Sequence, residues 1–286
     1  SQLTSVVWQD GAVKRYHHED ARWPQAVTGI TDEAGVRYGS YAYDAQGRVT
    51  RSELAGGAER LDFAYATDGN GQPTTSITDY SGPGGAATTR SYTFTDIGGV
   101  RYPSNLTAPC SLCGSTQQQS SYDASGNPIR QIAHDGTVTF IAYDAKARET
   151  ERASFPASFG SAATRPALAS ATKVVSTKWH ATFNLPTQVA EPNKVSANTY
   201  NAKGMLTGQS WTATTDPTGA AKFTAVKTGS TYATGWGYSA SSLATTIVTK
   251  ETAAGATAAV ETGRWTMAYV ANGDITSVTD VTGGNR

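Results

Sequence analysis

The chain has 286 residues, of which 23 are basic and 23 acidic, so its formal net charge at pH 7 is zero. With this balance the chain has no excess of positive charge that would indicate binding to nucleic acid or to an anionic membrane surface. Two cysteines exclude a small fold held by a disulfide framework, and no apolar run approaches the roughly 20 residues that a membrane-spanning helix needs.

The composition favours strands and tight turns over helices. Charged residues make up 16% of the chain, which contains 29 glycines and 14 tyrosines. Tyrosine, threonine, valine and isoleucine favour strands, whereas glycine with aspartate or asparagine favours turns. We therefore expect an all-β fold, and no pattern in the sequence indicates a cofactor.

A five-residue motif led by an aromatic residue recurs along the chain. Its first copy is Tyr43-Asp44-Ala45-Gln46-Gly47. Two pairs of copies share one interval: Tyr122 and Tyr143 are 21 residues apart, and so are Trp179 and Tyr200. Trp179-His180 therefore stands where a Tyr-Asp pair is expected. The residues that carry the motif are Tyr43, Asp44, Gly47, Tyr122, Asp123, Gly126, Tyr143, Asp144, Trp179, Tyr200, Asn201, Gly204, Tyr269 and Gly273.

The motif predicts the turn of a β-hairpin. Aspartate at the first turn position and glycine at the fourth suit a type I turn whose last residue takes a positive φ. The aspartate side chain can also accept hydrogen bonds from backbone N–H groups two residues on. We expect such turns at residues 44–47, 123–126 and 201–204. Further turns at residues 134–136 and 191–194 would return the chain, which gives serial antiparallel hairpins.

Several copies depart from the motif, and the stretches between copies are less regular. Ala147 replaces the turn glycine and Val270 replaces the turn aspartate, while residues 65–71 resemble a copy with extra residues in its turn. A short helix is expected at residues 166–172. Residues 212–235 and 253–263 are interpreted as long loops or poorly matching hairpins. No linker divides the chain, so we expect residues 1–286 to be one segment, cut from a longer protein.

Two clusters invite a chemical interpretation. Cys110 and Cys113 form a Cys-x-x-Cys loop. We favour a local disulfide or two unreactive thiols over metal binding, because a structural zinc site needs about four ligands and this loop supplies two. His17-His18-Glu19-Asp20 is interpreted as a solvated loop rather than a metal or acid–base cluster. Phosphate-binding and nucleophile-elbow motifs do not occur, so we do not expect an enzyme.

Several blocks of the sequence resemble the YD-repeat proteins, also called rearrangement-hotspot (RHS) proteins. They are the Tyr-Asp-x-x-Gly copies, Ala21-Arg22-Trp23-Pro24 with residues 27–33, and residues 179–187. The resemblance implies that the hairpins form a curved sheet, part of a hollow β-shell. Such shells enclose a C-terminal toxic domain in bacterial polymorphic toxins, and a similar shell serves adhesion in teneurins. The resemblance also implies a secreted or cell-surface location.

Two functions therefore compete. The favoured one is a structural shell segment that encloses or displays a downstream toxin domain, with the rest of the same polypeptide as its partner. The alternative is an extracellular binding or adhesion module that recognises a glycan or a protein receptor through outward-facing aromatic residues or loops. In either case, unpaired sheet edges are expected to associate with one another.

Overall fold

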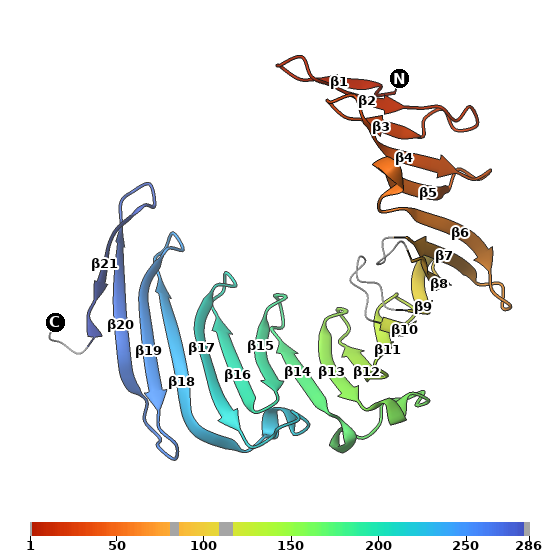
Figure 1. Cartoon of the computed structure of the whole chain (residues 1–286). Coiled ribbons are helices and arrows are strands. Elements are labelled where there is room, and N and C mark those ends of the chain that lie inside the picture. Colours follow the sequence, from red (N-terminus) through yellow and green to blue (C-terminus); the bar gives the residue numbers. More distant parts are fainter. Residues whose placement is uncertain (1, 81–85, 109–116, 283–286) are drawn as a thin grey trace. The chain divides into compact units, whose positions relative to one another are not determined.

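The computed structural model describes residues 2–80, 86–108 and 117–282 (Figure 1). This part of the chain contains 21 strands, all paired in antiparallel fashion, and its helical residues are confined to three-residue 3-10 turns. The prediction of an all-β fold built from serial hairpins is therefore confirmed.

The strands fall into two compact units, Ser1–Gly126 and Asn127–Arg286. The strands of the first unit are β1 (Ser5–Val7), β2 (Val13–His17), β3 (Gly29–Thr31), β4 (Arg37–Tyr43), β5 (Val49–Leu54), β6 (Leu61–Thr67), β7 (Pro73–Asp79), β8 (Thr88–Ile97), β9 (Val100–Leu106) and β10 (Gln117–Tyr122). Those of the second unit are β11 (Pro128–Ala133), β12 (Val138–Tyr143), β13 (Glu149–Phe155), β14 (Lys173–Trp179), β15 (Pro186–Glu191), β16 (Lys194–Tyr200), β17 (Leu206–Thr214), β18 (Lys227–Tyr238), β19 (Ala244–Thr252), β20 (Val260–Tyr269) and β21 (Ile275–Asp280).

Within each unit, strands that are consecutive in the chain pair with each other. In the first unit this series runs from β1 to β10. In the second it runs from β11 to β21. Such a sheet needs no crossover connection, so hairpins can be added one after another.

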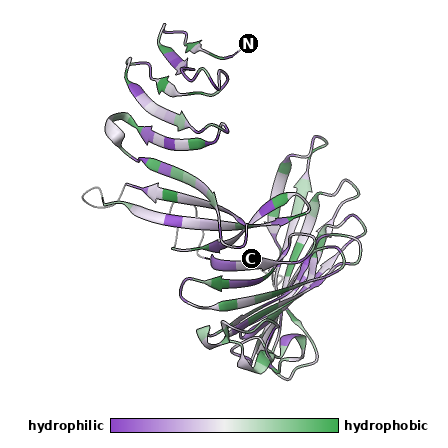
Figure 2. Ribbon diagram, turned by 90° about the vertical axis from the view of Figure 1, so that its right-hand side faces the viewer, coloured by the Kyte–Doolittle hydropathy of each residue, from purple (hydrophilic) through white to green (hydrophobic). Residues whose placement is uncertain are grey.

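The apolar core of the second unit lies on one face of β12 to β14. Val138, Phe155 and Val174 are fully buried there, and cross-strand pairing sets Val138 opposite Phe155. Burial of each such side chain stabilises the fold by about 1.5–3 kcal/mol. Figure 2 shows hydrophilic and hydrophobic residues alternating along strands, and since successive side chains point to opposite faces, this alternation gives the core strands an apolar face. We call this side of the second unit the core face.

Two connections cover the core face. Phe159 and Leu168, from the segment after β13, and Ala220, from the segment after β17, pack against the core. Glu151, buried on the same face, binds both segments through ion pairs with Arg165 (3.1 Å) and Lys222. A buried carboxylate with two cationic partners avoids the cost of an unpaired buried charge. The core thus depends on loops as well as on strands.

One expectation about the irregular segments needs correction, and the other two are resolved in favour of poorly matching hairpins. Residues 166–172 contain only a three-residue 3-10 turn, η4 (Leu168–Ser170), because the segment follows the sheet surface. Within residues 212–235, β17 continues to Thr214 and β18 begins at Lys227, so the loop spans 215–226. Within residues 253–263, β20 already begins at Val260. Frequent glycine and threonine hide the strand period of β18, but pairing on both sides holds its backbone extended.

Candidate functional site

The turn between β4 and β5 shows how one motif copy folds. The Asp44 N–H donates to the carbonyl of Arg48 (2.9 Å), and the Gly47 N–H donates to the carbonyl of Asp44 (3.2 Å). The Asp44 carboxylate accepts the backbone N–H groups of Gln46 and Arg48, at 2.9 Å each. Gly47 has φ of 77°, and the pairing register shifts between Ala42 and Tyr43. This is a type I turn closed by a left-handed residue and a β-bulge.

Other copies keep this backbone although their side chains differ. Gly126, Gly204 and Gly273 occupy the left-handed position with φ of 83°, 79° and 94°, and Ala147 takes it with φ of 57°. Where Val270 replaces aspartate, the two backbone bonds of the turn remain, at 3.0 and 2.9 Å. The turn therefore depends more on its backbone bonds than on the aspartate side chain.

The Trp179-His180 copy has a turn that is one residue longer. The His180 N–H donates to the carbonyl of Leu185, five residues on, rather than four. The imidazole Nδ1 accepts the backbone N–H groups of Thr182 and Phe183, at 3.1 and 3.2 Å. Histidine here takes the place of the aspartate carboxylate as the acceptor inside the turn.

The aromatic residue before each turn makes a second, longer-range contact. The Tyr200 hydroxyl donates to the carbonyl of Pro186 (2.8 Å), the first residue of β15, and the Tyr143 hydroxyl donates to that of Pro128 (3.0 Å), the first residue of β11. Trp179 does the same through its indole N–H, to the carbonyl of Glu149 (2.8 Å), the first residue of β13. Each aromatic side chain thus ties the end of its strand to the preceding strand.

The same contact recurs at a constant cross-strand register. Gln188 lies opposite Ala197. Continuing this register by two residues places Pro186, which accepts from Tyr200, opposite Thr199, the residue just before the aromatic one. The other acceptors take the same position when the register of their strands is continued. We call these aromatic residues the tethers. They are Tyr43, Tyr65 and Tyr122 in the first unit, and Tyr143, Trp179, Tyr200, Tyr238 and Tyr269 in the second.

Six of the eight tethers donate to the carbonyl of the first residue of a strand, whereas Val27 precedes β3 and Pro103 lies within β9. A buried carbonyl without a donor is costly, whereas a neutral hydrogen bond contributes about 1 kcal/mol net. Burial raises the pKa of Tyr43, Tyr65 and Tyr122, so these hydroxyl groups remain protonated donors at neutral pH. In the second unit a tether is the last residue of every second strand from β12 to β20. The tethers therefore lie side by side at one end of the strands (Figure 1).

Basic side chains link two of these turns to the next turn at the same end of the strands. Arg148 binds the Asp144 carboxylate of its own turn (2.8 Å) and donates to the carbonyl of His180 in the next turn (2.9 Å). Its guanidinium group also lies over the Trp179 ring, 5.5 Å from the centroid. Lys203 reaches the following turn and donates to the carbonyl of Ala240 (3.0 Å). Neighbouring turns therefore contact one another directly as well as through the sheet.

Two tethers differ from the sequence-based expectation. The motif predicts no turn after Tyr238, because Ser239 and Ser242 replace the turn aspartate and glycine; Ser242 nevertheless takes the left-handed conformation, with φ of 68°. Residues 65–71 have no extra residues in the turn. Instead β6 continues for two residues beyond Tyr65 to Thr67, and the turn begins at Asp68. An aromatic residue one to three positions before a polar turn is the signal that identifies both.

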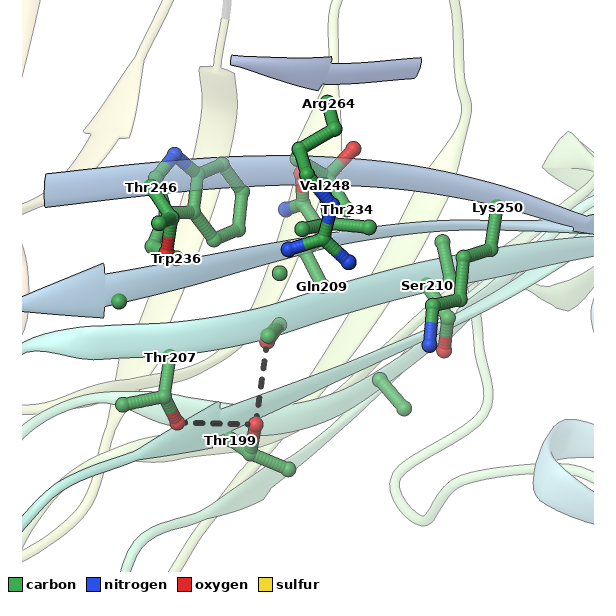
Figure 3. A pocket seen from close by; sticks show the side chains of 15 residues that line it. Thr199, Thr207, Gln209, Ser210, Thr234, Trp236, Thr246, Val248, Lys250 and Arg264 are labelled. Carbon is green, nitrogen blue, oxygen red and sulfur yellow. Dashed lines mark hydrogen bonds between the residues drawn. The ribbon is translucent and has the colours of Figure 1, made fainter. Parts of the chain in front are cut away.

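Beyond the covering loops, the core face carries an open groove of about 550 Å³ over β16 to β20 (Figure 3). Gly208, Gly235 and Gly237 form part of its lining, together with Thr199 and Thr246. A Cβ at position 208 would lie 2.7 Å from the Thr199 hydroxyl, so glycine keeps this surface open. Lys250 and Arg264 border it, and Arg264 binds Glu261 through two hydrogen bonds, at 2.8 and 2.7 Å.

The remaining candidate residues have other placements. Cys110 and Cys113 lie outside the described residues. His17 contacts the Thr31 hydroxyl (2.7 Å), and Glu19 accepts two hydrogen bonds from Arg37, which lower the pKa of that carboxyl to about 2. Within residues 2–80, 86–108 and 117–282, no three histidine, cysteine or acidic side chains converge as a metal site would require. The helical turns in these ranges are all too short to span a bilayer.

The chain is similar to solved toxin-complex structures at low sequence identity. It matches no protein-family model and no curated protein. The crystal structure of TcdB2-TccC3 aligns with 97% of this chain and 16% of that chain, at 11% identity and a TM-score of 0.41. The structure of the Photorhabdus luminescens Tc holotoxin pore with a TccC3 mutation aligns with 94% of this chain and 20% of that chain, at 9% identity and a TM-score of 0.35. This chain therefore spans a fifth or less of the chains that it matches.

Proposed function

We propose that this chain is a structural segment of the wall of a YD-repeat shell, and that its role is to enclose or display a downstream domain of the same polypeptide rather than to catalyse a reaction. The observation that carries the proposal is the set of tethers. Eight aromatic side chains, in eight hairpins, make one kind of hydrogen bond at one cross-strand register. Such repetition serves a wall better than it serves a single reactive centre.

The pairing of the strands supports a wall physically. Within each unit, each interior strand has both of its backbone edges occupied by neighbours, so unpaired N–H and C=O groups are concentrated at the outer strands of that unit. Sheet edges are where unwanted association begins, and a continuous series of hairpins keeps them few. The tethers and the basic residues between turns then hold the strand ends, which are the positions where a sheet frays most readily.

The partner in this proposal is the remainder of the same polypeptide, including a downstream core and toxic domain. The site of action is outside the producing cell, either secreted or at the cell surface. These two elements rest on the sequence resemblance to YD-repeat proteins, with the balanced charge and the serial hairpins in agreement. A wall must exclude proteases from what it encloses, and this requirement provides the test.

The test is limited proteolysis of the full polypeptide that carries this chain. We expect the downstream domain to resist added protease in the parent protein. A variant in which Tyr143, Tyr200, Tyr238 and Tyr269 are each replaced by phenylalanine should expose that domain earlier, because four strand ends in one unit lose their donors. Tyr232→Phe, which removes a hydroxyl from the middle of β18, is the matched control. Equal digestion of the downstream domain in all three proteins would contradict the proposal.

A further inference from the structure

The open groove on the core face of the second unit lies beyond the two covering loops. Over β12 to β14, Phe159 and Leu168 from one of these loops pack against the core. Over β16 to β20 the same face is hollowed into the groove of about 550 Å³ (Figure 3). Small-molecule sites in proteins typically have volumes of about 300–1,000 Å³. The groove is therefore large enough to hold a small ligand.

The pairing register lines the groove with two rows of residues that cross the strands. The first row, from β16 to β20, consists of Thr199, Gly208, Gly235, Val248 and Arg264. The second row, from β16 to β19, consists of Ala197, Ser210, Ala233 and Lys250. Directly opposite residues in an antiparallel sheet share a face, so the two rows lie side by side. Since neighbouring strands are about 4.8 Å apart, the first row spans about 19 Å, and an extended chain can lie along it.

The middle of the groove is apolar. Gly208 and Gly235 lie directly opposite each other there, so the centre of the first row carries no side chain. The Thr199 and Thr207 hydroxyl groups are hydrogen-bonded to each other (3.1 Å, Figure 3). The backbone N–H and C=O groups of β17 and β18 are used in strand pairing. A ligand in the middle of the groove therefore meets mainly apolar atoms.

Positive charge gathers at one end of both rows. Arg264 ends the first row and Lys250 ends the second. Two nitrogen atoms of Arg264 bind the Glu261 carboxylate, whereas Lys250 makes no hydrogen bond or ion pair with the described residues. Two cations and one carboxylate leave this end with one positive charge in excess. Ser210 lies in the same row as Lys250, and in Figure 3 the Lys250 ammonium group points toward it.

We propose that the groove binds a carboxylate that carries a long, unbranched acyl chain. The chain lies across Gly208 and Gly235, where the removal of its apolar surface from water favours binding. The carboxylate lies at Lys250 and Ser210, which supply a charge-assisted and a neutral hydrogen bond. A single negative charge also balances the excess positive charge of that end. This binding activity is independent of the wall function proposed above.

The test is calorimetric titration of the whole chain with decanoate, decanol and butanoate, each below the concentration at which it aggregates. Decanoate should bind at one site per chain. Decanol has the same chain length without the charge and should bind about tenfold more weakly or less, because it loses the charge-assisted hydrogen bond. Butanoate has the carboxylate but buries little apolar surface, so it should give no binding heat at the same concentrations.

Two variants divide the site into its charged end and its apolar middle. Lys250→Gln should weaken decanoate binding by about tenfold, because a hydrogen bond to a charged group is lost, and should bring decanoate and decanol closer in affinity. Gly235→Leu fills the middle of the groove and should weaken both ligands by about tenfold or more. An added Cβ at Gly235 lies 3.7 Å from its nearest neighbour, the Thr207 carbonyl oxygen, so the sheet can accept the larger residue.

Lys227→Gln is the matched control, because it removes the same charge from the start of β18, outside the groove. Its affinity for decanoate should stay within about twofold of the parent value, and circular dichroism checks the fold of all three variants. Decanoate binding that is weakened in both test variants and kept in the control supports the proposal. The proposal is overturned if the parent protein does not bind decanoate, if decanol binds equally well, if binding survives either test substitution, or if the control loses it too.

Discussion

Removal of one tether hydroxyl should weaken the second unit by a measurable and local amount. In Tyr200→Phe the ring stays and only the hydrogen bond to the Pro186 carbonyl (2.8 Å) is lost. A neutral hydrogen bond of this kind contributes about 1 kcal/mol. With a urea m-value of about 2 kcal/mol/M, the unfolding midpoint should fall by about 0.5 M. Urea titration followed by circular dichroism measures this shift.

The tether series provides an additivity test. Tethers on alternate strands are about 9–10 Å apart, a separation at which stability effects usually add. Phenylalanine at Tyr143, Tyr200, Tyr238 and Tyr269 together should therefore cost about 4 kcal/mol. Tyr232→Phe removes a hydroxyl that has no hydrogen bond with the described residues, and its midpoint should match that of the parent protein. If Tyr200→Phe and Tyr232→Phe shifted the midpoint equally, the tether hydrogen bond would have no stabilising role.

Three further outcomes follow from turns, charges and edges. Ala147→Gly should stabilise the chain and Gly204→Ala destabilise it, each by about 1 kcal/mol in thermal unfolding, because both positions have a positive φ (57° and 79°). Hydrogen bonds from Arg37 to Glu19 and from Arg60 to Asp62 lower the pKa of each carboxyl to about 2, from 4.5 and 3.8. As the pH falls, the unfolded state therefore binds protons before the folded state does, and the free energy of unfolding should decrease from pH about 4.5 to 2. Glu19→Gln combined with Asp62→Asn should make this decrease smaller in acid titrations. Val278, on the terminal strand β21, is 60% exposed, and Val278→Lys should reduce self-association in light scattering, whereas unchanged association would place the contact elsewhere.

Local turn chemistry explains why much of the fold could be predicted from the sequence. The turn at Asp44 and Gly47 needs only a side-chain acceptor and a left-handed residue, and both are read from five consecutive positions. Tyr238 could not be recognised in this way, because Ser242 takes the left-handed conformation without being glycine. There the pairing of β18 with β19 imposes the turn, and pairing is a property of distant segments.

The residues that accept the tether hydrogen bonds could not be predicted from the sequence, for a different reason. Pro186 contributes a backbone carbonyl, and a carbonyl is present at every residue, so no side-chain pattern marks it. Its selection depends on the register between β15 and β16. The groove on the core face has the same origin, since Gly208, Gly235 and Val248 are brought together by pairing across strands and are far apart in the chain.

Because a tether recognises a main-chain group, the hairpin it belongs to can change its side chains freely while the contact persists. The acceptors include proline, valine, leucine, alanine and glutamate. Long excursions such as residues 156–172 and 215–226 leave the sheet at the opposite ends of the strands, where no tether is interrupted. In evolution, a sequence of this kind can therefore diverge, lengthen or exchange hairpins, and no compensating change in a partner side chain is required.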